Sequence, residues 1–366
     1  MNRVVITGMG ALNGEIKPCT VFDAAGLSTV RFGEIGGLDG KNRLHEIIRR
    51  SLGDMLSDAG LTSADISACG TDCRMFFGTL LARDSAYLEH SRSGADTLAS
   101  MNEFAVYAAE LAGVRGSVDI SSASCAAGTT AIGMAFDFIR NGLCKCAVAG
   151  GAEELTQIAG YGFNCLKSLS RDVCNPYDVT RDGINIGEGG AFFMLETLES
   201  ARSRNAKIYC EILGFASGND AYHATSPEPT GEEAYHLMMN ALDDAGITAG
   251  QIDYINGHGT GTILNDSMET NALKRLYDGA ERKPFVSSTK ALVGHCMGAS
   301  GAIELASVLR SMQTGEPIVM PKLNEPLDDS GMFAAPESID MEYALSNSFG
   351  FAGNSACIVL RKWVGE

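Results

Sequence analysis

The sequence predicts an α/β fold built from layers, and three observations support this prediction. Short apolar runs alternate with longer segments of helical periodicity, and glycine-rich turns separate them. An internal repeat with an offset of 170 residues, from Cys125 to His295, predicts two similar halves. Hydrophobic residues make up 45% and charged residues 20% of 366 positions, which suits a chain with a large core and excludes global disorder.

The first predicted element is a buried strand at residues 4–7, a short β-branched run. The glycines of Gly8-Met9-Gly10 resemble the start of a dinucleotide-binding loop, but Asn13 stands where that motif needs its third glycine. No clear helix opens after them, and no acidic residue closes a second strand at the usual distance. We therefore expect a tight turn after this strand.

Further elements follow from periodicity. Residues 44–59 and 101–111 predict amphipathic helices, and residues 126–139 are apolar on nearly every side, which predicts a fully buried helix. Residues 75–77 and 147–149 predict buried strands.

The repeat divides the chain. The segment from Cys125 to Arg140 matches the segment from His295 to Arg310: both follow a serine-rich strand end and both continue as helices of small, apolar residues. Small residues let two helix backbones pack closely, so we expect these helices to meet at the centre. The predicted halves are residues 1–204, which carry the cysteine, and residues 205–366, which carry two histidines of interest.

Charge and cysteine content limit the function classes. A net charge of −17 argues against a binder of nucleic acid or of anionic membranes. No uncharged apolar stretch is long enough to span a bilayer, and the first apolar run is too short for a signal peptide, so we expect a cytoplasmic protein. Eleven scattered cysteines suit a reduced chain, and the lone close pair, Cys144 and Cys146, lacks partners for a zinc site, so no metal is expected.

Three residues form a candidate nucleophilic site. Cys125 precedes a predicted helix, whose dipole and free N–H groups favour a thiolate. His258 lies among glycines and threonines at residues 256–262, and His295 occupies the repeat position of Cys125. If the central helices face each other, one thiol and two imidazoles converge, which is a set suited to acyl transfer. The loop at 347–353 has aromatic residues between glycines and could supply an oxyanion donor and a gate.

These residues carry a family resemblance. The chain resembles a β-ketoacyl-(acyl carrier protein) synthase of the elongating Cys-His-His type, within the thiolase superfamily. The resemblance runs nearly end to end. Its motifs include Arg3 to Gly10, Gly150 to Glu153, Arg181 to Gly189, Asn205 to Tyr209, and the combination of Cys125, His258, Lys290, His295, Gly350 and Phe351.

The resemblance implies a thiolase-like fold in an α-β-α-β-α arrangement with buried central helices. It also implies a decarboxylative Claisen condensation: Cys125 holds the acyl group, and His258 and His295 bind the malonyl thioester. The roles it implies for the other positions are an oxyanion hole from Cys125 and Phe351, a gate at Phe351, contacts to the pantetheine arm from Thr260 and Thr262, an acyl-pocket wall near Phe163 and Phe349, a charged pair of Lys290 and Glu304, and structural carboxylates at Asp266 and Glu269.

The implied partner is an acyl carrier protein, whose phosphopantetheine arm carries the substrates, so no bound cofactor is expected. A dimer is expected, with itself or with a related synthase-like chain. Because carrier proteins are acidic, docking should use a local basic cluster, with Arg49 and Arg50 or Arg202 and Arg204 as candidates.

Two other functions stay open. One is a thiolase acting on coenzyme A thioesters, which would use a second cysteine such as Cys357, although the context of Cys357 predicts a core strand. The other is a chain-length subunit of a ketosynthase heterodimer, either without catalysis, in which case it usually lacks the nucleophile, or dependent on its partner. A chain that is active only beside such a partner also stays open. Ala352 departs from the commoner glycine of the family and could stiffen the gate, and residues 78–81 differ in a pocket-lining turn. Acyl length, and a fatty-acid or a specialised polyketide or polyene pathway, stay open.

Overall fold

The computed structural model describes residues 1–18, 30–38, 42–82, 101–321 and 323–365. Ten strands form one sheet in the order β10-β9-β11-β12-β8-β1-β7-β6-β4-β5. The strands are β1 (Val4–Asn13), β4 (Cys73–Gly78), β5 (Val118–Ser121), β6 (Cys146–Glu153), β7 (Gly189–Thr197), β8 (Cys210–Asn219), β9 (Tyr254–Asn256), β10 (Phe285–Ser287), β11 (Tyr343–Phe349) and β12 (Asn354–Lys362). A separate hairpin pairs β2 (Glu15–Pro18) with β3 (Arg31–Glu34).

The sheet consists of two halves with the same topology, as the repeat predicted. The first half has the order β1-β7-β6-β4-β5, and the second has β8-β12-β11-β9-β10. Strand directions match as well: the first two pairings in each half are antiparallel and the last two are parallel. Antiparallel pairing of Val4–Ile6 with β8 joins the halves. The predicted boundary after residue 204 lies between helix α7 (Leu198–Ser203) and β8.

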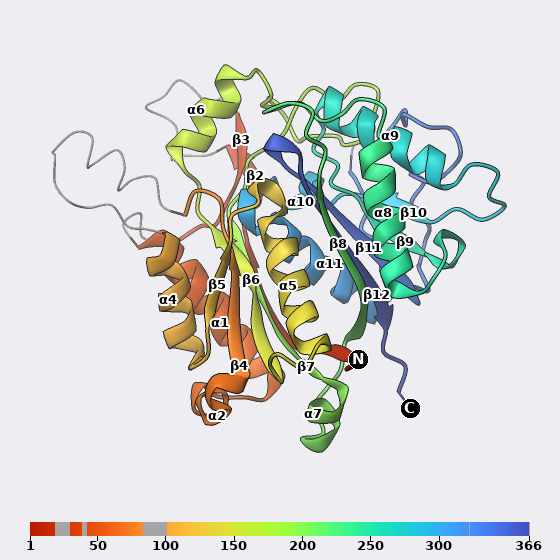
Figure 1. Cartoon of the computed structure of the whole chain (residues 1–366). Helices are drawn as coiled ribbons and strands as arrows, with labels where there is room; N and C mark the ends of the chain where they lie inside the picture. The colour runs from red at the N-terminus through yellow and green to blue at the C-terminus, as the bar shows by residue number, and fades with distance from the viewer. Residues whose placement is uncertain (19–29, 39–41, 83–100, 322, 366) are drawn as a thin grey trace, which may run out of the picture.

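Helices cover and separate the half-sheets in layers (Figure 1). Helices α1 (Arg43–Ala59) and α4 (Met101–Ala112) lie on the outer side of the first half, and α8 (Glu232–Ala245) and α9 (Ile263–Leu276) on that of the second. Between them lie α5 (Ala127–Arg140) and α11 (Ser300–Thr314), which pack on each other and on both half-sheets. This is the expected layered arrangement with buried central helices.

Glycines set the spacing of the central helices. A Cβ at Gly301 in α11 would lie only 2.9 Å from the backbone nitrogen of Thr129 in α5. A Cβ at Gly128 would lie 3.0 Å from the backbone nitrogen of Ala302. The two backbones therefore approach more closely than side chains would allow, and this brings the N-terminal ends of both helices together.

The predicted turn at Gly8-Met9-Gly10 is wrong. Strand β1 continues through these residues to Asn13, with only a bulge between Ile6 and Gly8. The glycines serve packing instead: a Cβ at Gly8 would lie 3.0 Å from the Cα of Ala59, and one at Gly10 would overlap the backbone of α1. Without side chains, the strand lets α1 lie directly against it.

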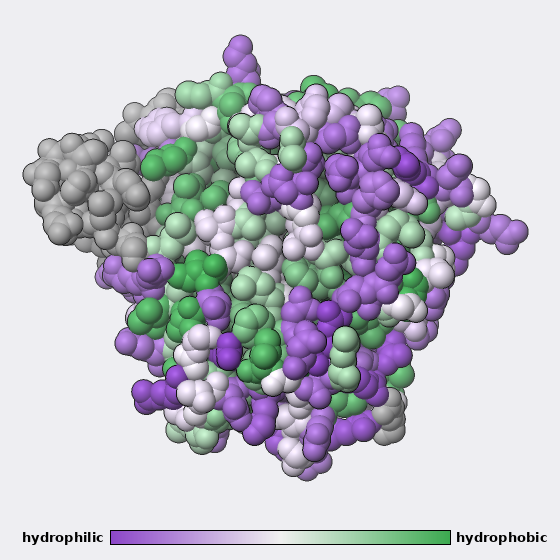
Figure 2. All heavy atoms as spheres, viewed as in Figure 1, coloured by the Kyte–Doolittle hydropathy of each residue, from purple (hydrophilic) through white to green (hydrophobic). Residues whose placement is uncertain are grey.

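The other predicted elements are present with ends shifted by a few residues. Residues 44–59, 101–111 and 126–139 lie in α1, α4 and α5, and residues 75–77 and 147–149 lie in β4 and β6. The remaining short helices are α2 (Ser63–Ala68), α6 (Gln157–Cys165) and α10 (Lys290–Val293). Hydrophilic residues cover much of the face over α8 and α9 in Figure 2, as expected for outer helices. Among the described residues, no helix is long and apolar enough to cross a membrane.

Candidate active site

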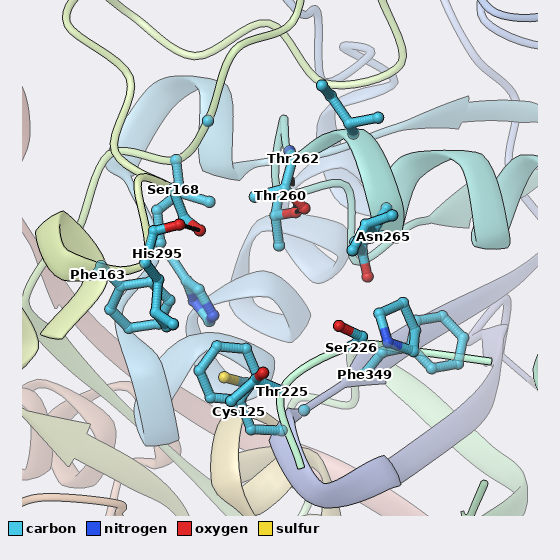
Figure 3. Close-up of a pocket in the computed structure, with 18 of the residues that line it drawn as sticks. Cys125, Phe163, Ser168, Thr225, Ser226, Thr260, Thr262, Asn265, His295 and Phe349 are labelled. Carbon is cyan, nitrogen blue, oxygen red and sulfur yellow. Dashed lines mark hydrogen bonds between the residues drawn. The ribbon is translucent and has the colours of Figure 1, made fainter. Parts of the chain in front are cut away.

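One pocket of about 350 Å³ collects most of the predicted site residues (Figure 3). It lies where the N-terminal ends of the two central helices meet the loop after β11. Its lining includes predicted residues from both halves: Cys125, Phe163, His258, Thr260, Thr262, His295, Phe349 and Phe351. The repeat therefore brings the thiol and both imidazoles together, as the sequence predicted.

Cys125 lies in a 3-10 turn, Ser124–Ala126, immediately before α5. Ser124 has a positive φ of 49°, an uncommon conformation for a residue with a side chain. This sharp turn after β5 aims the sulfur into the pocket, although the residue is only 4% exposed. The backbone N–H of Phe351 donates to the sulfur, and Gly350 must lack a side chain because a Cβ there would lie 2.9 Å from the Cys125 nitrogen.

Burial dominates the ionisation of this thiol. It raises the pKa of Cys125 to about 12, while the Lys290 ammonium and the Phe351 N–H act in the opposite direction. The helix N-terminus that predicted a thiolate is present, but it acts inside an apolar enclosure. Burial therefore favours the protonated thiol over the thiolate, and that proton must leave when the sulfur forms a new bond.

His258 is oriented by a buried charged pair. Its Nδ1 lies 3.1 Å from the Nζ of Lys290, and Lys290 also donates to the carboxylate of Glu304. An ammonium group has no lone pair to accept with, so the Nδ1 of His258 is the acceptor and its Nε2 carries the proton. Burial and the nearby Lys290 charge hold the pKa of His258 well below its usual value, which keeps the ring neutral.

Two buried carboxylates hold the loop that carries His258. Glu269 accepts from the backbone nitrogens of His258 (2.8 Å) and Gly259 (2.9 Å) and from the hydroxyl of Tyr177 (2.7 Å). Asp266 accepts from the backbone nitrogens of Thr260 (3.0 Å) and Tyr177 (2.9 Å). Both predicted structural carboxylates thus lie behind the loop and outside the pocket lining.

His295 lies on the turn before α11. Its backbone N–H donates to the Asn185 carbonyl at 2.7 Å, and its carbonyl accepts from Gly187 at 2.9 Å. Its ring meets the His258 ring edge-on, with centroids 5.3 Å apart. Burial and the Lys290 charge lower the pKa of His295 well below its usual value. The pocket therefore brings together two imidazoles whose burial favours the neutral form and a thiol whose burial favours the protonated form.

Three aromatic residues line the pocket: Phe163, Phe349 and Phe351. The predicted loop at 347–353 is shorter than expected, because residues 347–349 belong to β11. Phe351 stacks on Phe163 with ring centroids 5.4 Å apart, and Phe349 meets the His258 ring edge-on at 6.1 Å. Ala352 has a left-handed φ of 58°, where a methyl group is unfavourable. Its N–H donates to the Ala224 carbonyl at 2.8 Å, and its carbonyl accepts from the Asn219 side chain at 2.7 Å, so the gate loop is tied to the loop after β8.

The outer rim is polar in part. The Thr260 and Thr262 hydroxyls lie 2.8 Å apart and line the pocket on the side facing away from Cys125 (Figure 3). Ile263 and Leu264 follow at the start of α9 and are 63% and 55% exposed.

The candidate docking arginines lie elsewhere. Arg49 and Arg50 both pair with Glu46 on α1, and Arg204 pairs with Glu196, which is nearly buried. None of them lines the pocket, whereas Lys167 does.

Sequence reasoning missed several residues of the site. Ser168, Thr225 and Ser226 line the pocket from loops, and Asn265 lines it from the first turn of α9; no motif marked any of them. The carboxylate of Glu153 accepts from the backbone nitrogens of Leu80, Leu81, Ala82 and Gly298 and from the Thr79 hydroxyl. It links the turn after β4 to the turn after His295. An acidic residue ending a wholly buried strand was the signal for it.

Comparison with known proteins identifies the family. Residues 43–201 match the model of the β-ketoacyl synthase N-terminal domain, and residues 209–324 match that of the C-terminal domain. The chain belongs to the β-ketoacyl synthase family.

The names of two similar proteins agree with this family assignment. A putative mitochondrial 3-oxoacyl-[acyl-carrier-protein] synthase of Schizosaccharomyces pombe is 39% identical over 267 residues, covering 67% of this chain and 61% of the relative. The 3-oxoacyl-[acyl-carrier-protein] synthase 2 of Staphylococcus aureus is 36% identical over 262 residues, covering 69% of this chain and 63% of the relative. The matched region thus spans less than two thirds of the length of these relatives.

Solved structures share the fold over the whole chain. A type II polyketide ketosynthase in complex with its acyl-carrier protein has a TM-score of 0.88 at 25% identity, and covers 99% of both chains. The ishigamide ketosynthase/chain length factor gives 0.88 at 26% identity, also with 99% of both chains covered. A β-ketoacyl synthase from Burkholderia phymatum gives 0.87 at 30% identity, covering 99% of this chain and 100% of the other. The thiolase-like fold is therefore established.

The alternative of a thiolase is not favoured. Cys357, the candidate second cysteine, lies in the middle of β12, pairs in register with Asn347 and is fully buried. It does not line the pocket, and burial raises the pKa of its thiol. The second half contributes His258 and His295 to the pocket instead of a cysteine.

Proposed function

We propose that this chain catalyses the decarboxylative condensation of an acyl group on Cys125 with a malonyl group carried by an acyl carrier protein. The observation that carries the proposal is the convergence of Cys125, His258 and His295 in one pocket whose inner wall is aromatic. A chain that only sets chain length would not need this set of groups.

The first half-reaction transfers the acyl group. The Cys125 sulfur bonds the thioester carbonyl carbon, the bond to the pantetheine sulfur breaks, and the released thiol takes up the proton that Cys125 loses. The backbone N–H groups of Cys125 and Phe351 are the proposed donors to the oxyanion. Phe163 and Phe351 would enclose the acyl chain.

The second half-reaction forms the carbon–carbon bond. The malonyl carboxylate leaves as carbon dioxide, and its electron pair moves onto the thioester as an enolate. The Nε2–H groups of His258 and His295 would stabilise this enolate by donating to its oxygen. The enolate carbon then attacks the acyl carbonyl on Cys125, the bond from that carbon to the sulfur breaks, and the released thiolate takes up one proton from water. The product is a β-ketoacyl thioester two carbons longer.

The proposed partner is the carrier protein, whose pantetheine arm would pass between Thr260 and Thr262. Its docking site would be the rim of this pocket, where Lys167 and the exposed Ile263 and Leu264 lie, in place of the distant arginine pairs. We include in the proposal a dimer, either with itself or with a related chain, since one similar structure is a ketosynthase/chain length factor. Absence of a resident cofactor and a cytoplasmic location are likewise proposed from the sequence.

The test separates the two half-reactions. Purified protein is mixed with acyl- and malonyl-carrier protein, and the products are analysed by mass spectrometry together with carbon dioxide release. Native protein should give the product that is two carbons longer. Cys125→Gln should lose condensation, because no sulfur can hold the acyl group, and should retain malonyl decarboxylation because both histidines remain. Persistent condensation by Cys125→Gln would remove Cys125 from the mechanism.

A further inference from the structure

The second histidine has a hydrogen-bond partner that no motif predicted. Nδ1 of His295 lies 2.6 Å from the hydroxyl oxygen of Ser300, the first residue of α11. Both residues are only 2% exposed, so water does not compete for this contact. The site thus contains two imidazoles whose Nδ1 atoms face different partners: Lys290 for His258 and Ser300 for His295.

We propose that Ser300 is a positioning residue that fixes His295 in the tautomer with its proton on Nε2. The inference rests on the proposed function, in which this Nε2–H donates to the malonyl thioester oxygen. It assigns to a neutral hydroxyl the task that Lys290 performs for His258.

The direction of the hydrogen bond follows from the needs of the buried hydroxyl. A buried hydroxyl proton requires an acceptor. Within the described part of the chain, the Ser300 hydroxyl has one hydrogen-bond partner, the Nδ1 of His295. If Nδ1 carried the proton and donated to Ser300, the hydroxyl proton would need another acceptor. Donation from Ser300 satisfies both groups and leaves the imidazole proton on Nε2.

The surroundings prevent the ring from escaping this contact. The backbone of His295 is held on both sides, by Asn185 and by Gly187. The His258 ring stands edge-on against the His295 ring. Because Ser300 at the start of α11 holds Nδ1 of His295, Nε2 is the ring nitrogen that can face the pocket. The Nε2 of His258 is its counterpart there. A hydroxyl fixes the tautomer without adding a second cation beside Lys290.

The first test observes the tautomer directly in protein without substrate. Two-bond ¹H–¹⁵N spectra of protein labelled with ¹⁵N-histidine distinguish a protonated ring nitrogen from a bare one, and a His295→Asn variant assigns the signals. Native protein should show a bare Nδ1 and a protonated Nε2 in His295. Ser300→Ala should show loss of this single tautomer, with the His258 signals unchanged. A proton on Nδ1 in native protein, or an unchanged His295 tautomer in Ser300→Ala, would overturn the proposal.

The second test measures malonyl decarboxylation in a Cys125→Gln background, which removes condensation. Loss of one hydrogen bond predicts a fall of about fivefold to tenfold for Ser300→Ala. Ser300→Thr keeps a hydroxyl and should restore much of the rate. Ser307→Ala is the matched control, because Ser307 lies on the same helix and, among the described residues, its hydroxyl donates only to the Ile303 carbonyl, at 3.1 Å. An equal fall in Ser307→Ala would indicate a general effect on α11 and contradict the proposal.

The two tests also separate this inference from the proposed function. If native and Cys125→Gln proteins release no carbon dioxide from malonyl-carrier protein, the proposed function fails. The spectra would still decide the tautomer. If decarboxylation occurs and the tautomer does not depend on Ser300, the function stands and the role of Ser300 fails.

Discussion

The two halves of the molecule share a scaffold and differ in the chemistry they contribute. Their strands have the same order and directions, and a residue of positive φ precedes the key side chain in each: Ser124 before Cys125 and Gly294 before His295. In the first half the helix begins two residues after the thiol. In the second it begins five residues after the imidazole, following a 3-10 turn at Met297–Ala299.

This difference in the turn changes how each side chain sits relative to its helix. Cys125 lies in the 3-10 turn immediately before α5 and lines the pocket. His295 sits farther from its helix and folds back onto Ser300, the helix start. The duplicated fold thus places Cys125 and His295 in one pocket, on turns of different length before their helices.

The largest effect is expected from removing His295, one of the two proposed hydrogen-bond donors in the second half. His295→Ala should slow malonyl decarboxylation by about a hundredfold to a thousandfold, the usual cost of losing one oxyanion donor. Transfer of the acyl group to Cys125 should change far less, because the sulfur and the Phe351 N–H remain. Separate measurement of carbon dioxide release and of acyl-enzyme formation checks this. Equal losses in both steps would contradict the division between the halves.

The sequence predicted the shared scaffold of the two halves well where local signals carried it. The 170-residue repeat placed the central helices and paired Cys125 with His295, since matching apolar helices must bury matching faces. The Gly8-Met9-Gly10 prediction failed because glycine in a strand allows close helix packing as readily as it allows a turn. No role was predicted for Ser300, or for Glu153 beyond its place in the motif from Gly150 to Glu153, because their partners lie on turns, and turn geometry brings together residues that no periodicity relates.

The next largest effect is expected on stability, from the packing of α5 against α11 between the two halves. Gly301→Ala should lower the free energy of unfolding by about 1–3 kcal/mol, because its methyl group would meet the Thr129 backbone. Gly53→Ala is the control: it lies inside α1 with no atom within 4 Å of its added Cβ, and should raise stability by about 0.5–1 kcal/mol. Urea unfolding measures both. A neutral Gly301→Ala would mean that the central helices do not depend on this close contact.

The smallest effect is on the pH dependence of stability. Burial lowers the pKa of His258 and of His295 in the folded chain. In acid, the unfolded chain therefore binds more protons at these two residues than the folded chain does. Their contribution to stability is present above the unfolded value of 6.5 and is lost as the pH falls below it. Urea midpoints between neutral and mildly acid pH should fall more steeply in native protein than in a variant with both histidines replaced by Asn. Parallel profiles would show that the rings are not buried neutral.

The most direct test of the central claim, that the halves join to form an acyl-accepting site, is the intact mass of the protein after mixing with acyl-carrier proteins bearing short and long chains. We predict a mass gain equal to one acyl group in native protein and none in Cys125→Ala. The favoured chain length would show how long an acyl group the aromatic pocket accepts. A gain that persists in Cys125→Ala would place the acyl group elsewhere, and a native protein without any gain from carrier protein, with or without a partner chain, would contradict the account.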